Sequence, residues 1–201
     1  MTADEVQAGD DASWVAIDTP LGLDALRAFC GDLERLYRIN PYLEIRSWTP
    51  AGANAVRVDW RNLSNQQAVA LELHRTRESD DAFSIGFSAG LKRATHFRLE
   101  PAAAGSRLTI TDRYDGLPQE ERERRLAEVD KSLEAWGWAL HAYLAREHRW
   151  GANPLWPWAT RRFWLPLRPS SRRIGGLIVL VTLAEFAFFL LVALIWWSEH
   201  R

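Results

Sequence analysis

The sequence has little that would support metal, redox or covalent chemistry. Cys30 is the one cysteine among 201 residues, which excludes an internal disulfide and a cysteine-based structural zinc site. The chain also lacks a glycine-rich phosphate loop, the spacing of metal ligands, and a serine or cysteine nucleophile motif. Its formal net charge is −1, so it has no basic excess of the kind that nucleic-acid binding needs. We expect no metal, and no nucleic acid as a partner.

The beginning of the chain lacks an export signal. MTADEVQAGDDAS is acidic and has no apolar run, whereas a secretory signal needs a basic start followed by an apolar core. Residues 1–12 are predicted to be a disordered lead-in. We expect the folded part to stay on the side of the membrane where it was made.

One long apolar run is present near the other end. Residues 174–197 contain a single charged residue, Glu185, and are long enough for a helix to cross about 30 Å of hydrocarbon. Trp196 and Trp197 end the run, and tryptophan favours the headgroup level. Arginines precede it, so the positive-inside rule places the folded domain on the cytoplasmic side, with residues 198–201 as a short far-side tail. We expect the membrane to be a bacterial inner membrane. The run predicts a single-pass tail anchor; the alternative is a buried core helix.

Residues 151–173, just before this run, are rich in tryptophan, proline and arginine. Prolines prevent one continuous helix, and tryptophan beside arginine suits a boundary between an apolar phase and anionic headgroups. We predict a membrane-surface collar, with the alternative that the segment packs on its own domain. The residues expected at the membrane surface are Trp156, Trp158, Trp164, Arg161, Arg162, Arg172 and Arg173.

Glu185 indicates a partner inside the membrane, because an ionised carboxylate in a membrane span costs several kcal/mol. The group is therefore expected to be neutral, paired or in contact with a protein partner. Thr182 lies one turn earlier, and Gly175 and Gly176 permit close approach of another helix. These residues predict contact with another membrane protein or a second copy of this chain. The alternative is a neutral glutamate tolerated in lipid.

Residues 13–150 are predicted to form the folded domain. A short strand is expected near residues 13–20, and helical spacing follows in GLDALRAFCGDLERLYRINP. About six segments between residues 42 and 114 alternate strictly between apolar and polar residues, which indicates an antiparallel sheet with one apolar face. Roughly from Glu120 to Arg149, an apolar stripe at helical spacing predicts a long helix that packs on this face.

This order of elements resembles the START-like (SRPBCC) superfamily, which includes polyketide cyclases, coenzyme-Q-binding proteins and lipid-transfer domains. The resemblance covers residues 13–150 and rests on the element order, on the helical segment before the sheet and on EVDKSLEAWGWALHAYL after it. It implies an α+β helix-grip fold, with six to seven antiparallel strands wrapped on a long C-terminal helix. One transmembrane helix would follow.

In this fold a cavity often remains between the sheet and the long helix. The side chains that the alternation and the helical stripe direct towards it are Trp60, Asn62, Leu71, Phe83, Ile85, Phe87, Phe97, Ile110, Asp112, Tyr114, Leu133 and Trp136. An apolar wall with few polar groups suits a lipophilic ligand, so we expect a quinone, isoprenoid or acyl lipid and no other cofactor. The alternative is that the large side chains fill the space as solid core.

Asp112 is the one ionisable residue that the strand pattern directs inward, and a buried carboxyl group needs a partner. It is the candidate general base, with a purely structural role as the alternative. His74 and His96 fall on the polar face. The basic residues of the strand region alternate with acidic ones, which predicts a solvated sheet face.

Three functions are compatible with these features. The favoured one is binding or presentation of a lipophilic small molecule by a membrane-tethered domain. The second is a cyclase or dehydratase that acts on a polyketide-like substrate. The third is an accessory subunit of a membrane complex.

Overall fold

The computed structural model describes residues 12–114 and 131–200. The chain divides into two compact units that meet between Pro166 and Leu167, and each unit is described by itself.

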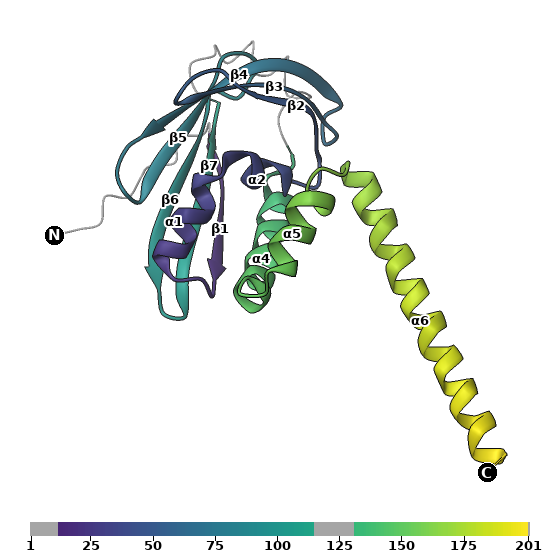
Figure 1. Cartoon of the computed structure of the whole chain (residues 1–201). Coiled ribbons are helices and arrows are strands. Elements are labelled where there is room, and N and C mark those ends of the chain that lie inside the picture. Colours follow the sequence, from purple (N-terminus) through teal and green to yellow (C-terminus); the bar gives the residue numbers. More distant parts are fainter. Residues whose placement is uncertain (1–11, 115–130, 201) are drawn as a thin grey trace. The chain divides into compact units, whose positions relative to one another are not determined.

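The first unit is built on one seven-stranded antiparallel sheet (Figure 1). Its strands are β1 (Ala12–Thr19), β2 (Leu43–Pro50), β3 (Ala55–Asn62), β4 (Gln67–Arg77), β5 (Ala82–Phe87), β6 (Ala94–Ala102) and β7 (Gly105–Arg113). They lie side by side in the order β1-β7-β6-β5-β4-β3-β2. Strands β2 to β7 therefore form a meander, and β1 pairs with the last of them, so that β1 and β2 are the two edges.

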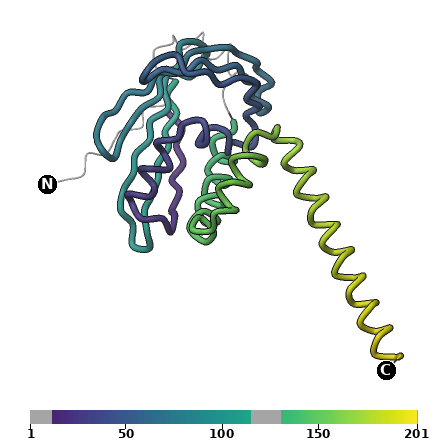
Figure 2. The backbone as a smooth tube through the Cα atoms, viewed as in Figure 1, coloured from purple at the N-terminus to yellow at the C-terminus, as the bar shows by residue number. Residues whose placement is uncertain are grey.

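Helices lie on the concave side of this sheet, which curves over them (Figure 2). Between β1 and β2 the chain forms α1 (Leu23–Gly31) and α2 (Leu33–Arg38). The break between them is at Asp32, whose side chain accepts a hydrogen bond of 3.1 Å from the Arg35 backbone N–H and so caps α2. After the sheet come α4 (Leu133–Trp150), α5 (Leu155–Ala159) and the π-helical turn η2 (Thr160–Trp164).

The apolar positions of the strands and of α4 meet in one core. Leu73, Ile85 and Ile110 from the sheet are buried together with Trp136 and Leu140 from α4. The indole of Trp136 also donates a 3.1 Å hydrogen bond to the Leu36 carbonyl oxygen, which ties α4 to α2. This is the predicted helix-grip fold, and the prediction is confirmed. The part of the predicted long helix before residue 131 lies outside the described residues.

Close packing of α4 on the edge strand β1 depends on a glycine. A Cβ atom at Gly137 would lie 2.7 Å from Val15 Cγ2, closer than side-chain carbons normally approach. The missing side chain lets α4 lie against β1, which fixes how far the helix stands from the rest of the sheet.

The second unit is one helix, α6 (Pro169–Glu199), of 31 residues. Its most apolar window has a mean hydropathy of 2.8 and no buried residue, so the helix is long and apolar enough to cross a membrane. Thr182, Glu185 and Gly176 are exposed on this helix, and Gly175 is half-buried.

Candidate ligand-binding cavity

A cavity of about 270 Å³ lies between the sheet, α2 and the first turn of α4. It is formed where β2, β3 and β4 meet the loops that follow α2, β3 and β5. Its lining residues are Tyr37, Asn40, Leu43, Trp60, Asn62, Asn65, Gln67, Ala68, Val69, Leu71, Phe87, Ala89, Gly90, Leu91, Lys92, Tyr114 and Trp136. Gln67, Ala68 and Gly90 among them are exposed, so the cavity is open to solvent on the side of these residues.

Aromatic rings form the inner wall of the cavity. Tyr37 stacks on Trp60 with ring centroids 5.6 Å apart, and it meets Trp136 at 5.2 Å. Trp60 in turn contacts Phe87 at 6.2 Å. Because each ring is held by another ring, and Trp136 also by its indole hydrogen bond, the wall is rigid and presents flat apolar surfaces.

A buried ion pair marks the polar side of the cavity. Lys92, a lining residue, places its ammonium nitrogen 2.8 Å from Asp112 Oδ2 and 5.5 Å from the centre of the Phe87 ring. The hydroxyl group of Thr95 donates a 2.6 Å hydrogen bond to Asp112 Oδ1. Both carboxylate oxygens are thus engaged, as burial of a charged carboxylate requires. Lys92 lines the cavity, whereas its carboxylate partner Asp112 does not.

Two asparagines hold the loops at the mouth of the cavity. Asn40 donates to Ser132 Oγ at 2.9 Å, and its side-chain oxygen accepts from the Tyr42 backbone N–H at 2.9 Å. The Asn62 side-chain oxygen accepts from the Ser64 backbone N–H at 2.9 Å. These bonds connect the loop after α2 to the residue just before α4, and they order the turn after β3.

The structure brings half of the predicted ligand-binding residues to the cavity: Trp60, Asn62, Leu71, Phe87, Tyr114 and Trp136. Ile85, Phe97, Ile110 and Leu133 are buried in the core instead. Phe97 stacks on Phe83 with centroids 4.6 Å apart, so these rings fill the middle of the sheet. Asp112 lies behind Lys92, and Phe83 lines a different pocket.

Several lining residues did not emerge from the sequence, among them Tyr37, Asn40, Val69 and Lys92. Asn40 and Lys92 lie between regular elements, where no periodicity marks the direction of a side chain. For Lys92 the sequence pattern is misleading, because the mixed charges around this residue predict a solvated face. Tyr37 lies on the apolar stripe of the helical segment, and only the fold shows that this stripe forms a cavity wall.

The cysteine and the two histidines of the strand region do not line the cavity. Burial raises the pKa of the Cys30 thiol to about 12, so this thiol is protonated at neutral pH. His74 is exposed and lies 3.3 Å from Glu72, and half-buried His96 lies 3.1 Å from Glu78. Neither histidine lines the cavity.

The stretch predicted as a membrane-surface collar contains two kinds of residue. Trp156 is half-buried, and its indole donates a 2.7 Å hydrogen bond to Glu147 on α4. Leu165 is part of the core. By contrast, Trp158 and Phe163 are exposed and pack on each other at 5.0 Å. Of the other predicted surface residues, Trp164, Arg161, Arg162 and Arg173 are exposed and Arg172 is half-buried.

Solved structures share this architecture at low sequence identity. A protein from Nitrosomonas europaea has a TM-score of 0.50 and 8% identity, over 69% of this chain and 97% of that chain. A START superfamily protein from Mycobacterium smegmatis has a TM-score of 0.49 and 13% identity, over 66% and 94%. The di-domain ARO/CYC protein of the steffimycin biosynthetic pathway has a TM-score of 0.48 and 12% identity, over 69% and 52%. No protein family and no curated protein matches the amino-acid sequence.

The architecture is a helix-grip fold, a seven-stranded antiparallel sheet wrapped on a helix, and a long apolar helix follows it in the chain. At these identities the likeness extends to the fold alone. A ligand has to be inferred from the cavity of this chain itself.

Proposed function

We propose that the protein binds one lipophilic small molecule in the 270 Å³ cavity and holds it beside a membrane that α6 spans. The observation that carries this proposal is the cavity itself, with its wall of stacked aromatic rings and the Lys92 ammonium group on one side. Such a combination of apolar walls and few polar groups is typical of small-molecule sites.

The size of the cavity selects among the expected ligands. An apolar cavity of about 150 Å³ holds a benzene molecule, so 270 Å³ accommodates one or two fused rings. A quinone head fits in that space, whereas most of an isoprenoid or acyl chain would extend out of its open side. Its ring would stack between the aromatic walls, and a ring carbonyl oxygen would accept a hydrogen bond from Lys92.

The engaged carboxylate favours a binding protein over an enzyme. Asp112 would be the general base of a cyclase, but Thr95 donates to one of its oxygens and Lys92 to the other. It also does not line the cavity. A general base has to lie within hydrogen-bond reach of the proton that it removes from the substrate.

The first prediction concerns a variant that fills the cavity. Val69→Phe adds a ring at a half-buried lining position and should weaken binding of 1,4-naphthoquinone by about tenfold or more, because the added atoms occupy the ligand's space. The measurement is isothermal titration calorimetry on the full-length protein in phosphatidylcholine nanodiscs, with empty nanodiscs subtracted.

Ala70→Phe is the matched control for this variant. Ala70 is the next residue on β4, is exposed and does not line the cavity. Its replacement should change the affinity by less than about twofold, as for other surface substitutions. No binding to the unmodified protein, or an equal loss in the two variants, would refute the quinone-site proposal.

The second prediction concerns the membrane. Arginine at the centre of a membrane helix costs about 2.5–3.5 kcal/mol, so Leu183→Arg combined with Leu190→Arg should prevent insertion of α6. The unmodified protein should stay in the membrane pellet after alkaline carbonate washing, and this double variant should not. The control is the same pair of arginines at exposed Ala53 and Ala70. Release of the unmodified protein by carbonate would contradict the tether.

A further inference from the structure

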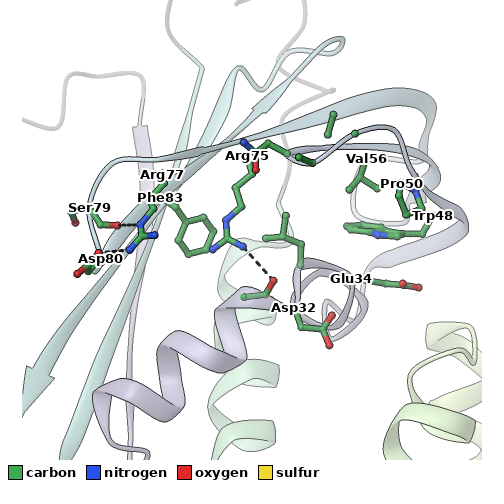
Figure 3. A pocket seen from close by; sticks show the side chains of 16 residues that line it. Asp32, Glu34, Trp48, Pro50, Val56, Arg75, Arg77, Ser79, Asp80 and Phe83 are labelled. Carbon is green, nitrogen blue, oxygen red and sulfur yellow. Dashed lines mark hydrogen bonds and ion pairs between the residues drawn. The ribbon is translucent and has the colours of Figure 1, made fainter.

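A second and larger pocket, of about 670 Å³, lies at a different place on the sheet (Figure 3). It is bounded by the junction of α1 and α2, by the β2–β3 hairpin and by the β4–β5 hairpin. Its lining residues are Gly31, Asp32, Leu33, Glu34, Trp48, Pro50, Gly52, Ala53, Asn54, Ala55, Val56, Arg75, Arg77, Ser79, Asp80 and Phe83. None of them lines the 270 Å³ cavity. The two spaces are therefore separate sites.

Arg75 extends into this pocket from β4, as Figure 3 shows. Its strand position is two residues from Leu73, so it lies on the core side of the sheet, although it is an arginine. The guanidinium group lies over the Phe83 ring, 4.4 Å from its centre, and donates one hydrogen bond of 3.3 Å to the Gly31 carbonyl oxygen. One face and one N–H group of the guanidinium group are thus engaged, and its other N–H groups remain available to a ligand in the pocket.

The arginine has no carboxylate partner among the residues that the structure describes, although three carboxylates line the same pocket. Arg77 forms an ion pair with Asp80, and Glu34 forms one of 2.6 Å with Arg38. Asp32 is used as the cap of α2.

Half-burial of Arg75 lowers the pKa of its guanidinium group, because the charged form loses hydration. A cation that loses hydration without a counter-charge is unfavourable, and an anion that enters the pocket would remove this cost.

We propose that the 670 Å³ pocket binds an organic monocarboxylate, with the carboxylate on Arg75 and the apolar body against Trp48 and Val56. The planar guanidinium fork matches the two oxygens of a carboxylate. Trp48 and Val56 are both half-buried. Together they form the apolar side of the pocket opposite Phe83 (Figure 3). A pocket of this volume is within the range of small-molecule sites, about 300–1,000 Å³.

The acidic residues of the pocket limit the charge of the ligand. Asp32, Glu34 and Asp80 contribute three negative charges, against two positive charges from Arg75 and Arg77. A dianion such as a phosphate monoester would be repelled more strongly than a monoanion. Of the two, a single carboxylate is therefore the anion that the pocket tolerates better.

An aromatic layer separates this pocket from the quinone cavity. Trp48 lines the pocket, and its ring meets that of Tyr37, a wall residue of the cavity, at 6.0 Å. The two sites are therefore expected to bind their ligands independently. Val69→Phe fills the cavity and should leave carboxylate binding in the pocket unchanged. Binding in the pocket does not require that the cavity bind a quinone.

The test uses 1-naphthoate as the probe, with the full-length protein in phosphatidylcholine nanodiscs and isothermal titration calorimetry. We expect 1-naphthoate to bind, and Arg75→Gln to weaken it by about tenfold or more through loss of the charge-assisted hydrogen bonds. Arg98→Gln is the matched control, because Arg98 on β6 is also exposed and paired, with Glu100, but does not line the pocket. It should change the affinity by less than about twofold. 1-Naphthyl phosphate should bind more weakly than 1-naphthoate.

Three results would contradict carboxylate binding in this pocket. The proposal is wrong if 1-naphthoate does not bind the unmodified protein, if Arg75→Gln and Arg98→Gln weaken its binding equally, or if 1-naphthyl phosphate binds as tightly. If Arg75→Gln does not fold, Ala55→Trp replaces it, since Ala55 is a half-buried lining residue and a tryptophan there would narrow the pocket without changing its charge. Unchanged affinity in that variant would also overturn the proposal.

Discussion

Replacing Asp112 with asparagine is expected to lower the free energy of unfolding by about 3 kcal/mol, because the Lys92 ammonium group loses a buried carboxylate partner. The side chain of Asp112 is 1% exposed and that of Lys92 is 15% exposed, so water replaces little of the lost interaction. In a domain of this size about 1 kcal/mol corresponds to about 2–4 °C, so the unfolding temperature should fall by about 6–12 °C. The measurement is thermal unfolding of the full-length protein in nanodiscs, followed by near-UV circular dichroism.

Two further variants separate burial from charge. Asp18→Asn removes a carboxylate that pairs with Arg107 on the surface, and its effect should be much smaller because exposed ion pairs contribute little. Adding Lys92→Met to Asp112→Asn removes the buried ammonium group as well and should restore most of the lost stability. An equal loss for Asp112→Asn and Asp18→Asn would show that the buried pair does not stabilise the cavity wall.

The sequence predicts the faces of the sheet well, because side chains alternate strictly along a strand. Val58, Leu73, Ile85 and Ile110 are all buried, as the alternation indicates. The same periodicity says nothing about position along a strand. It cannot separate Leu71, which lines the cavity, from Ile85, which is enclosed by core, since both point to the same side.

Position along the strands depends on which elements cover the sheet at each point. Phe83 and Phe97 stack on each other, and Trp136 packs on Phe97 edge-on at 6.0 Å, so the middle of the sheet is filled. Space remains on either side of this aromatic centre. Where this space remains depends on long-range packing between α2, α4 and the sheet. Local sequence patterns contain no information about this packing.

The charged residues of the cavity and of the pocket were the hardest to predict from the sequence. Arg75 and Lys92 occur among alternating acids and bases, which normally indicates a solvated surface. The register of β4 nevertheless puts Arg75 on the core side, and the loop before β6 turns Lys92 towards Asp112. The strand pattern did find Asp112, because an acid at an apolar position breaks the alternation.

Glu147→Ala is expected to lower the free energy of unfolding by about 3 kcal/mol and to release Trp156 from α4. Glu147 accepts from two groups, the Arg35 guanidinium at 2.7 Å and the Trp156 indole at 2.7 Å. Arg35 is buried, lies over the Phe29 ring and donates to the Tyr143 hydroxyl group, so it cannot turn to water when its carboxylate is removed. The unfolding temperature should fall by about 6–12 °C.

A second variant identifies the cause of this loss. Arg35→Met combined with Glu147→Ala removes both charges, and it should be more stable than Glu147→Ala alone because no cation is left buried without a partner. Trp156 should stay released in both variants, because its indole loses the acceptor in each. The measurement is hydrogen exchange at the indole N–H, followed by nuclear magnetic resonance. If that indole stayed protected in Glu147→Ala, ring contact with Tyr143 alone would hold α5 on the domain, since the two rings already lie 6.1 Å apart.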